Sequence, residues 1–177
     1  MRLRTVKIIN VIGIFLISFL FHQLYQWFPN RFIAIFFPVN ESIFEHLKLI
    51  YSAVIFWMLI EYFILQPIKH NNLILASLTT AVATNIIFLV LFLPVYNEIG
   101  HDLLITLIIY FIAIVLGQLI SYYILTLNTN YKILNLVSLI LIPLIFTMLG
   151  YLTYHPPKTP FFYDQYQDKY GIYNFYR

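Results

Sequence analysis

Histidine and carboxylate side chains gather in the segment PVNESIFEHLKL, which begins at residue 38. Ser42 and Glu45 have the spacing of a capping box, in which the hydroxyl and the carboxylate each accept a backbone amide at the start of a helix. Such a cap does not explain Asn40, Glu41 and His46. A histidine beside carboxylates can bind a metal ion or transfer protons, so we predict a functional site at this segment.

Three further histidines lie in settings that a site could use. His22 is flanked at four-residue spacing by Ser18 and Gln26. This polar stripe in an apolar segment is typical of a helix face that meets protein or a cavity. A neutral His22 that hydrogen-bonds to a neighbouring helix is the structural alternative. His101 begins a short polar pair, and His155 precedes a Pro-Pro pair at the end of an apolar segment.

Histidines from separate helices, together with nearby carboxylates, could form a zinc site with an open position for water. The metal hypothesis takes as ligands His46, His101 and His155. No HxxxH or HExxH spacing is present, so these ligands would have to converge from different segments. A metal-free acid–base site and a protonation-linked site for a transported solute are alternatives that the sequence leaves open.

The enzyme hypothesis divides the polar residues into two groups. The catalytic roles are assigned to His46, Glu45, His101 and His22. Contacts with substrate are expected from polar and aromatic side chains at the same outer side of the membrane. These are Asn40, Glu41, Asp102 and Tyr154.

The composition places these residues in a membrane. Of the 177 residues, 62% are hydrophobic and 10% are charged, far from the composition of a soluble domain. The net charge is +3, and the basic residues do not form a cluster. We therefore expect contact with lipid head groups and no nucleic-acid partner. Cysteine is absent, which excludes disulfides and thiol chemistry. No linker divides the chain, and we predict a single transmembrane domain over residues 1–177.

Five apolar segments reach the roughly 20 residues that a helix needs to cross a bilayer. The predicted fold class is therefore an all-α integral membrane protein, a bundle of about five transmembrane helices. The spans are expected at 8–28, 44–66, 73–94, 102–125 and 133–154, followed by a tail over 155–177. The apolar segment before the second span is too short to cross, and we predict that it lies in the interface or re-enters the membrane.

The positive charges predict an orientation. Arg2, Arg4 and Lys7 precede the first span, and Lys69 and Lys132 lie in loops on the same side, which is therefore assigned to the cytoplasm. The N-terminus is then cytoplasmic and the C-terminus extracytoplasmic, with the cell membrane as the location. This topology brings four of the five histidines to the outer ends of their spans.

The chain resembles a family of small bacterial multispan membrane proteins known as a domain of unknown function (DUF6512). The resemblance is carried by the motifs PVNESIFEHLKL and HPPKTPFFYDQYQDKYGI and extends over nearly the whole chain. This resemblance implies the membrane architecture and no particular activity. A more distant similarity links Ser42-x-x-x-His46 to intramembrane metal hydrolases of the ceramidase and progestin-receptor superfamily. It implies a zinc site in which this chain could offer Ser42, His46, Asp102 and His155. The chain lacks the late HxxxH of that group and has five predicted spans where seven are usual.

We therefore predict a membrane-embedded enzyme of the hydrolase or acyl-transfer type that acts on a lipid or lipid-linked substrate at the outer leaflet, with zinc as the candidate cofactor. The alternatives are a small-solute or ion transporter subunit and a non-catalytic membrane interaction protein. An enzyme needs its polar groups to converge at one outer pocket, whereas a transporter needs a polar route to the cytoplasm.

Overall fold

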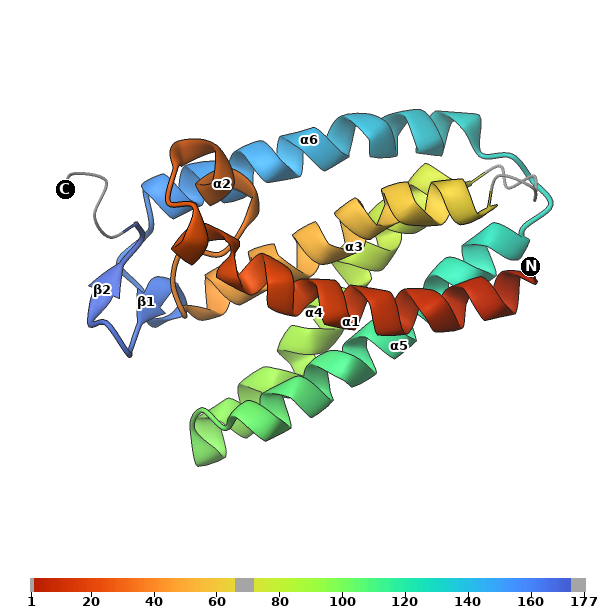
Figure 1. Cartoon of the computed structure of the whole chain (residues 1–177). Coiled ribbons are helices and arrows are strands. Elements are labelled where there is room, and N and C mark those ends of the chain that lie inside the picture. Colours follow the sequence, from red (N-terminus) through yellow and green to blue (C-terminus); the bar gives the residue numbers. More distant parts are fainter. Residues whose placement is uncertain (1, 66–71, 173–177) are drawn as a thin grey trace.

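The computed structural model describes residues 2–65 and 72–172 and consists almost entirely of helices (Figure 1). The helices are α1 (Leu3–Trp27), α2 (Arg31–Phe36), α3 (Ile43–Leu65), α4 (Leu73–Ile99), α5 (Leu103–Thr126) and α6 (Lys132–Tyr154). A 3-10 turn (Pro160–Phe162) then leads into an antiparallel hairpin of β1 (Tyr163–Asp164) and β2 (Lys169–Tyr170). The predicted all-α fold class is confirmed.

Five of these helices, α1, α3, α4, α5 and α6, are long and apolar enough to cross a membrane. They correspond to the five predicted spans, and most of their bounds agree within two residues. The main differences are that α1 begins at Leu3 and that α4 continues to Ile99, past Pro94. Hydrophobicity predicts only the part of a helix that lies in the hydrocarbon core of the membrane. Backbone hydrogen bonds extend these two helices past that part.

The short segment before the second span forms α2, which packs against α6. The side chain of Asn30 begins this helix by accepting a hydrogen bond from the amide of Ile33 at 2.9 Å. A Cβ atom added at Gly150 of α6 would lie 3.1 Å from Ile35, so the two helices approach closely there. The predicted short segment is therefore a helix held on the bundle.

The helices α4 and α5 form a close pair, and small residues lie where they meet. A Cβ atom added at Gly117 would lie 2.1 Å from Oγ1 of Thr84 on α4. Ala81 and Ala113 are both fully buried in the core. Small side chains let the two backbones approach, and this is how apolar helices gain packing contacts in a membrane.

One end of the molecule, which we call the hairpin end, gathers the features predicted for a site. Figure 1 shows the ends of α1, α4 and α6 and the starts of α3 and α5 at this end, with the hairpin beside them and the N-terminus at the opposite end. His22, His46, His101 and His155 therefore share the hairpin end, as predicted. The fifth histidine, His70, lies outside the described residues.

The opposite end carries a buried ion pair. The amino group of Lys7 on α1 donates to the carboxylate of Glu61 on α3 and, at 2.6 Å, to the hydroxyl of Ser121 on α5. These contacts join three helices and explain how a lysine within α1 is buried.

Candidate metal centre

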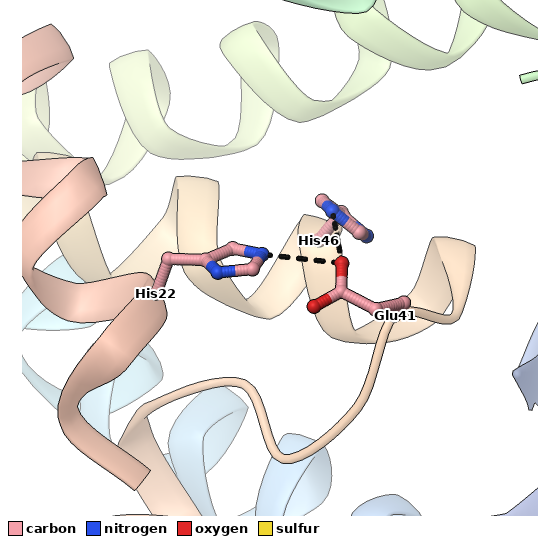
Figure 2. A group of neighbouring side chains, drawn as sticks. All are labelled: His22, Glu41 and His46. Atoms are coloured by element: carbon pink, nitrogen blue, oxygen red, sulfur yellow. Dashed lines mark ion pairs between the residues drawn. The ribbon is translucent and has the colours of Figure 1, made fainter. Parts of the chain in front are cut away.

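Two histidines and one glutamate converge at the hairpin end (Figure 2). Oε2 of Glu41 lies 3.3 Å from Nε2 of His22 and 3.5 Å from Nε2 of His46. One ligand atom from each of the three residues lies within 4.8 Å of the others. We call these three residues the His–Glu cluster. Their spacing and donor types suit a single metal ion such as zinc.

Each member of the His–Glu cluster comes from a different element. His22 lies in the last turns of α1, Glu41 in the loop between α2 and α3, and His46 in the first turn of α3. Figure 2 shows the His22 ring and the Glu41 carboxylate pointing toward each other from α1 and this loop. The candidate ligands converge from separate segments, which is consistent with the absence of an HxxxH motif from the sequence.

The orientation of His46 prepares its outer ring nitrogen for metal binding. Nδ1 of His46 lies 2.9 Å from the carbonyl oxygen of Ser42. A carbonyl oxygen only accepts, so Nδ1 carries the hydrogen and donates it, which in a neutral ring leaves the Nε2 lone pair free toward Glu41. A backbone carbonyl that fixes the tautomer in this way is a recurrent companion of metal-binding histidines.

The hairpin holds the loop that carries Glu41. Oδ2 of Asp164 accepts the backbone amide of Glu41 at 3.0 Å, and its Oδ1 accepts the amides of Tyr166 and Gln167 at 2.8 and 3.2 Å. The side-chain amide of Asn40 donates to the carbonyl of Gly171 at 2.9 Å. Asp164 is fully buried, so its carboxylate is committed to these backbone amides.

Replacing Asp164 by asparagine is expected to lower zinc affinity about tenfold, because outer-shell partners that position a ligand contribute at this scale. Asparagine has one acceptor oxygen where the two carboxylate oxygens accept three backbone amides, so the hold on the Glu41 loop weakens while the three candidate ligands stay in place. Asp168→Asn in the same hairpin is the matched control and should retain wild-type affinity. Equal zinc affinity of the two variants, measured by competition with a chromophoric chelator, would show that Asp164 does not position Glu41.

The electrostatic environment of Glu41 favours the ionised carboxylate. Burial alone would raise its pKa, but the hydrogen bond with His22 and the charges of His22, His46 and His101 outweigh burial and hold the pKa below its ordinary value of 4.5. Glu41 therefore stabilises the metal-free fold above pH 4.5, and this contribution is lost as the pH falls through the lowered pKa.

In the metal-free protein, His22→Gln is expected to raise the pKa of Glu41, because burial remains while the strongest favourable partner is lost. The stability that Glu41 provides should then disappear at a higher pH than in the wild type. Carbon-detected NMR titration of the Glu41 carboxylate measures this shift. His155→Gln should leave the titration unchanged. An unchanged Glu41 titration in His22→Gln would mean that His22 does not stabilise the carboxylate.

Two hollows of different character adjoin the His–Glu cluster. The first, which we call the apolar cavity, measures about 290 Å³. Apolar side chains from α1, α3, α4 and α5 line most of it, namely Phe19, Leu49, Ile50, Phe88, Leu103 and Leu107. The second, the polar hollow, measures about 470 Å³ and is lined with mostly polar surface. Its polar lining includes Tyr25, Gln26, Asn40 and Gln167.

His101 borders the site without joining the three ligands. It lines the apolar cavity together with His22, Glu41 and His46. Its Nδ1 lies 2.7 Å from the hydroxyl of Tyr166 in the hairpin. A small pocket of about 30 Å³ between the hairpin and α4 is also bordered by Glu41, His46 and His101, and it has room for a water molecule.

Three other predicted site residues have structural contacts. Asp102 begins α5, where its Oδ1 accepts the amide of Ile105 at 2.8 Å. The hydroxyl of Tyr154 donates to the carbonyl of Arg31 at 2.8 Å. The ring of His155 packs on Tyr151, with 4.9 Å between ring centroids. Of the three predicted zinc ligands, only His46 belongs to the His–Glu cluster. Among the described residues, His101 and His155 are not part of a group that could hold a metal ion.

Glu45 belongs to a buried network on the other side of α3. Its carboxylate lies 2.6 Å from the amino group of Lys48 and accepts the hydroxyl of Thr153 at 2.8 Å. Lys48 also donates to the carbonyl of Ala34 at 2.8 Å and to Thr153 at 2.7 Å. The network joins α2, α3 and α6. Sequence reasoning missed Lys48, although its position three residues after Glu45 is a spacing at which helical side chains meet.

The expected capping box at the start of α3 is half formed. Oγ of Ser42 accepts the amide of Glu45 at 3.3 Å, as predicted. The Glu45 carboxylate, however, accepts the amide of Val39 at 3.1 Å, and the amide of Ser42 donates to Asn40 at 2.9 Å. Ion pairing with Lys48 draws the carboxylate toward α6, and Asn40 takes over the second half of the cap.

The fold and the His–Glu cluster together define a multispan helical membrane protein with one candidate metal centre among the described residues. Residues 2–172 match the model of the Family of unknown function (DUF6512), and the chain belongs to this family. No curated protein and no solved structure gave a significant match. The family membership confirms the resemblance noted from the sequence motifs.

Proposed function

We propose that this protein is a metal-dependent membrane enzyme, of the hydrolase or acyl-transfer type, that acts on a lipid or lipid-linked substrate at the His–Glu cluster. The observation that carries the proposal is the convergence of His22, Glu41 and His46 beside an apolar cavity. Two imidazoles and one carboxylate are the donor set of catalytic zinc sites that keep a position open for water.

The proposed roles follow from the surroundings of each residue. His22, Glu41 and His46 would hold the metal, which when bound supplies a water with a pKa near 7 and polarises a carbonyl. Asp164 holds the Glu41 loop through the backbone amide. His101 borders the same cavity and is hydrogen-bonded to Tyr166, so it is the candidate to pass a proton to the leaving group. Glu45, paired with Lys48, has no proposed part in the chemistry.

The proposal includes an orientation in the cell membrane. Arg2, Arg4, Lys7 and Lys132 belong to the end opposite the hairpin, which the positive-inside rule assigns to the cytoplasm. The His–Glu cluster and the C-terminal hairpin would then face the extracytoplasmic side. A substrate could enter from the outer leaflet.

A proton-coupled transporter is the second candidate, and a set of buried polar contacts between α1 and α5 favours it. Ser18 lies 2.6 Å from the hydroxyl of Tyr110, and Asn10 donates to Gln118 at 3.3 Å. The ion pair of Lys7 follows toward the opposite end. These side chains follow the length of α1, although the buried Ile14 lies between Asn10 and Ser18.

Turnover of lipid by the purified protein tests the enzyme proposal. The protein is placed in vesicles of phosphatidylethanolamine and phosphatidylglycerol that contain a small fraction of mixed single-chain esters, with zinc or with a chelator, and the products are identified by mass spectrometry. We expect zinc-dependent products that His46→Ala does not form and His155→Ala does. Proton flux across the vesicles with no product would overturn the enzyme proposal in favour of transport.

A further inference from the structure

The His–Glu cluster stands at a boundary between the two hollows. His22 and Glu41 line both the apolar cavity and the polar hollow. His46 lines the apolar cavity, whereas Gln26, Asn40 and Gln167 belong to the polar hollow. A molecule bound at the cluster is therefore in contact with an apolar space on one side and a polar space on the other.

The apolar cavity opens toward lipid between α1 and α5. Two of its lining residues lie on the outer surface of the bundle, Phe19 with 46% and Leu103 with 66% of its surface exposed. Further from the hairpin end, the contact between Ser18 and Tyr110 joins the two helices. Figure 1 shows α1 and α5 diverging toward the hairpin end. A hydrocarbon chain can enter through this opening without crossing water.

The size of the apolar cavity favours one chain. A volume of about 290 Å³ is just below the range of small-molecule pockets, roughly 300–1,000 Å³. Because the lining is predominantly apolar, each methylene group that moves from water into the cavity makes the binding free energy more favourable. A second chain of a two-chain lipid would have to stay in the bilayer.

The polar hollow suits an uncharged headgroup. The side chains of Gln26 and Gln167 are exposed there and offer amide donors and acceptors. Among the described residues that line it, none is Lys or Arg, the side chains that usually bind phosphate. Hydroxyl groups of a headgroup such as glycerol can use the amides, whereas a phosphate would meet no lysine or arginine among these lining residues.

We propose that the substrate is a single-chain carboxylic ester, with its hydrocarbon chain in the apolar cavity, its neutral hydroxylated headgroup in the polar hollow and its ester group at the His–Glu cluster. This inference rests on the proposed function and names its substrate class. Hydrolysis joins the oxygen of water to the carbonyl carbon and breaks the bond from that carbon to the headgroup oxygen. One proton of the water ends on the released alcohol, the other is released to solvent, and the chain leaves as a carboxylate.

Alkyl hydroxamates bound to the cobalt-loaded protein in nanodiscs test the placement of the chain, because the hydroxamate group binds the metal and the visible spectrum of cobalt reports it. We expect octanohydroxamate to bind Leu107→Trp at least tenfold more weakly than wild type, since each methylene excluded from the cavity costs about fourfold. Acetohydroxamate should bind both equally, which also shows that the variant is folded. Leu103→Trp at the mouth is the second variant.

The matched control is Leu104→Trp, whose side chain is 68% exposed and does not line the apolar cavity. It should bind octanohydroxamate as the wild type does. Equal octanohydroxamate affinities in wild type, Leu107→Trp and Leu103→Trp would overturn the chain placement while leaving the metal site intact. A protein that binds no cobalt would overturn the proposed function itself, and the inference with it.

Turnover of two esters by the zinc-loaded protein tests the headgroup. We expect a kcat/KM for monodecanoylglycerol at least tenfold above that for the same ester carrying a phosphate on its glycerol. Gln26→Leu with Gln167→Leu should lower the first value and leave acetohydroxamate binding unchanged. An equal or higher kcat/KM for the phosphate ester would overturn the neutral-headgroup assignment.

Discussion

Alanine in place of His46 is expected to lower the affinity for zinc by more than about 100-fold. Loss of an outer-shell partner alone lowers the metal affinity of a site about 10–100-fold, and this substitution removes a ligand itself. Two donors would remain, His22 and Glu41, which are fewer than the three protein ligands of catalytic zinc sites. Isothermal titration of the purified protein at constant pH measures the difference, and pH must be fixed because binding requires unprotonated histidines.

The control for this prediction is His155→Ala, which removes a histidine at the same end of the molecule that packs on Tyr151. It should bind one zinc per chain with wild-type affinity. His101→Ala should also bind zinc, since His101 is hydrogen-bonded to Tyr166. If His155→Ala or His101→Ala lost zinc and His46→Ala kept it, the metal would be held by a different set of residues.

Glu45→Ala is expected to destabilise the protein by about 3–5 kcal/mol, because breaking a buried ion pair leaves the other charge without compensation. Lys48 is fully buried, and its remaining contacts, Thr153 and the carbonyl of Ala34, are neutral. The packing of α2 and α6 on α3 should weaken together. Unfolding in a mild detergent, followed by circular dichroism over a temperature or denaturant series, measures the loss.

A double variant separates the lost pair from lost packing. Glu45→Leu with Lys48→Met replaces both charges by apolar groups and should recover most of the stability, because an apolar pair avoids the cost of burying charge. Folded Glu45→Ala should still bind zinc, since Glu45 faces Lys48 and not the His–Glu cluster. Wild-type stability of Glu45→Ala would contradict the assigned role of the pair.

The membrane helices could be predicted because hydrocarbon demands long apolar segments, and the five segments are plain in the sequence. The start of α1 could not be placed from hydrophobicity, since Lys7 lies within the helix and is buried. Its burial depends on Glu61 and Ser121, which come from helices far along the chain. Contacts between distant helices decide such positions, and a single sequence does not record them.

The two histidines of the cluster were accessible to sequence analysis. His22 stands in a polar stripe of an apolar segment, and His46 follows a polar helix start. The sequence did not show which of the two carboxylates, Glu41 or Glu45, lies beside the histidines. Glu41 and Glu45 are four residues apart, but α3 begins at Ile43, so Glu41 stays in the loop beside the histidines. Glu45, inside the helix, pairs with Lys48.

The part played by the tail was also beyond sequence analysis. Asp164 and Glu41 are 123 positions apart, and their contact joins a side chain to a backbone amide. No residue pattern marks a backbone amide as a partner. The hairpin in this tail holds the loop that carries a candidate ligand.

X-ray absorption at the zinc edge of the zinc-loaded protein tests the central claim most directly. A centre built by His22, Glu41 and His46 predicts one zinc per chain, with two imidazole nitrogens near 2.0–2.1 Å and the remaining ligands oxygen. His46→Ala should reduce the imidazole contribution to one. Zinc bound without imidazole, or the same two-imidazole spectrum in wild type and His46→Ala, would contradict the assignment of the metal centre.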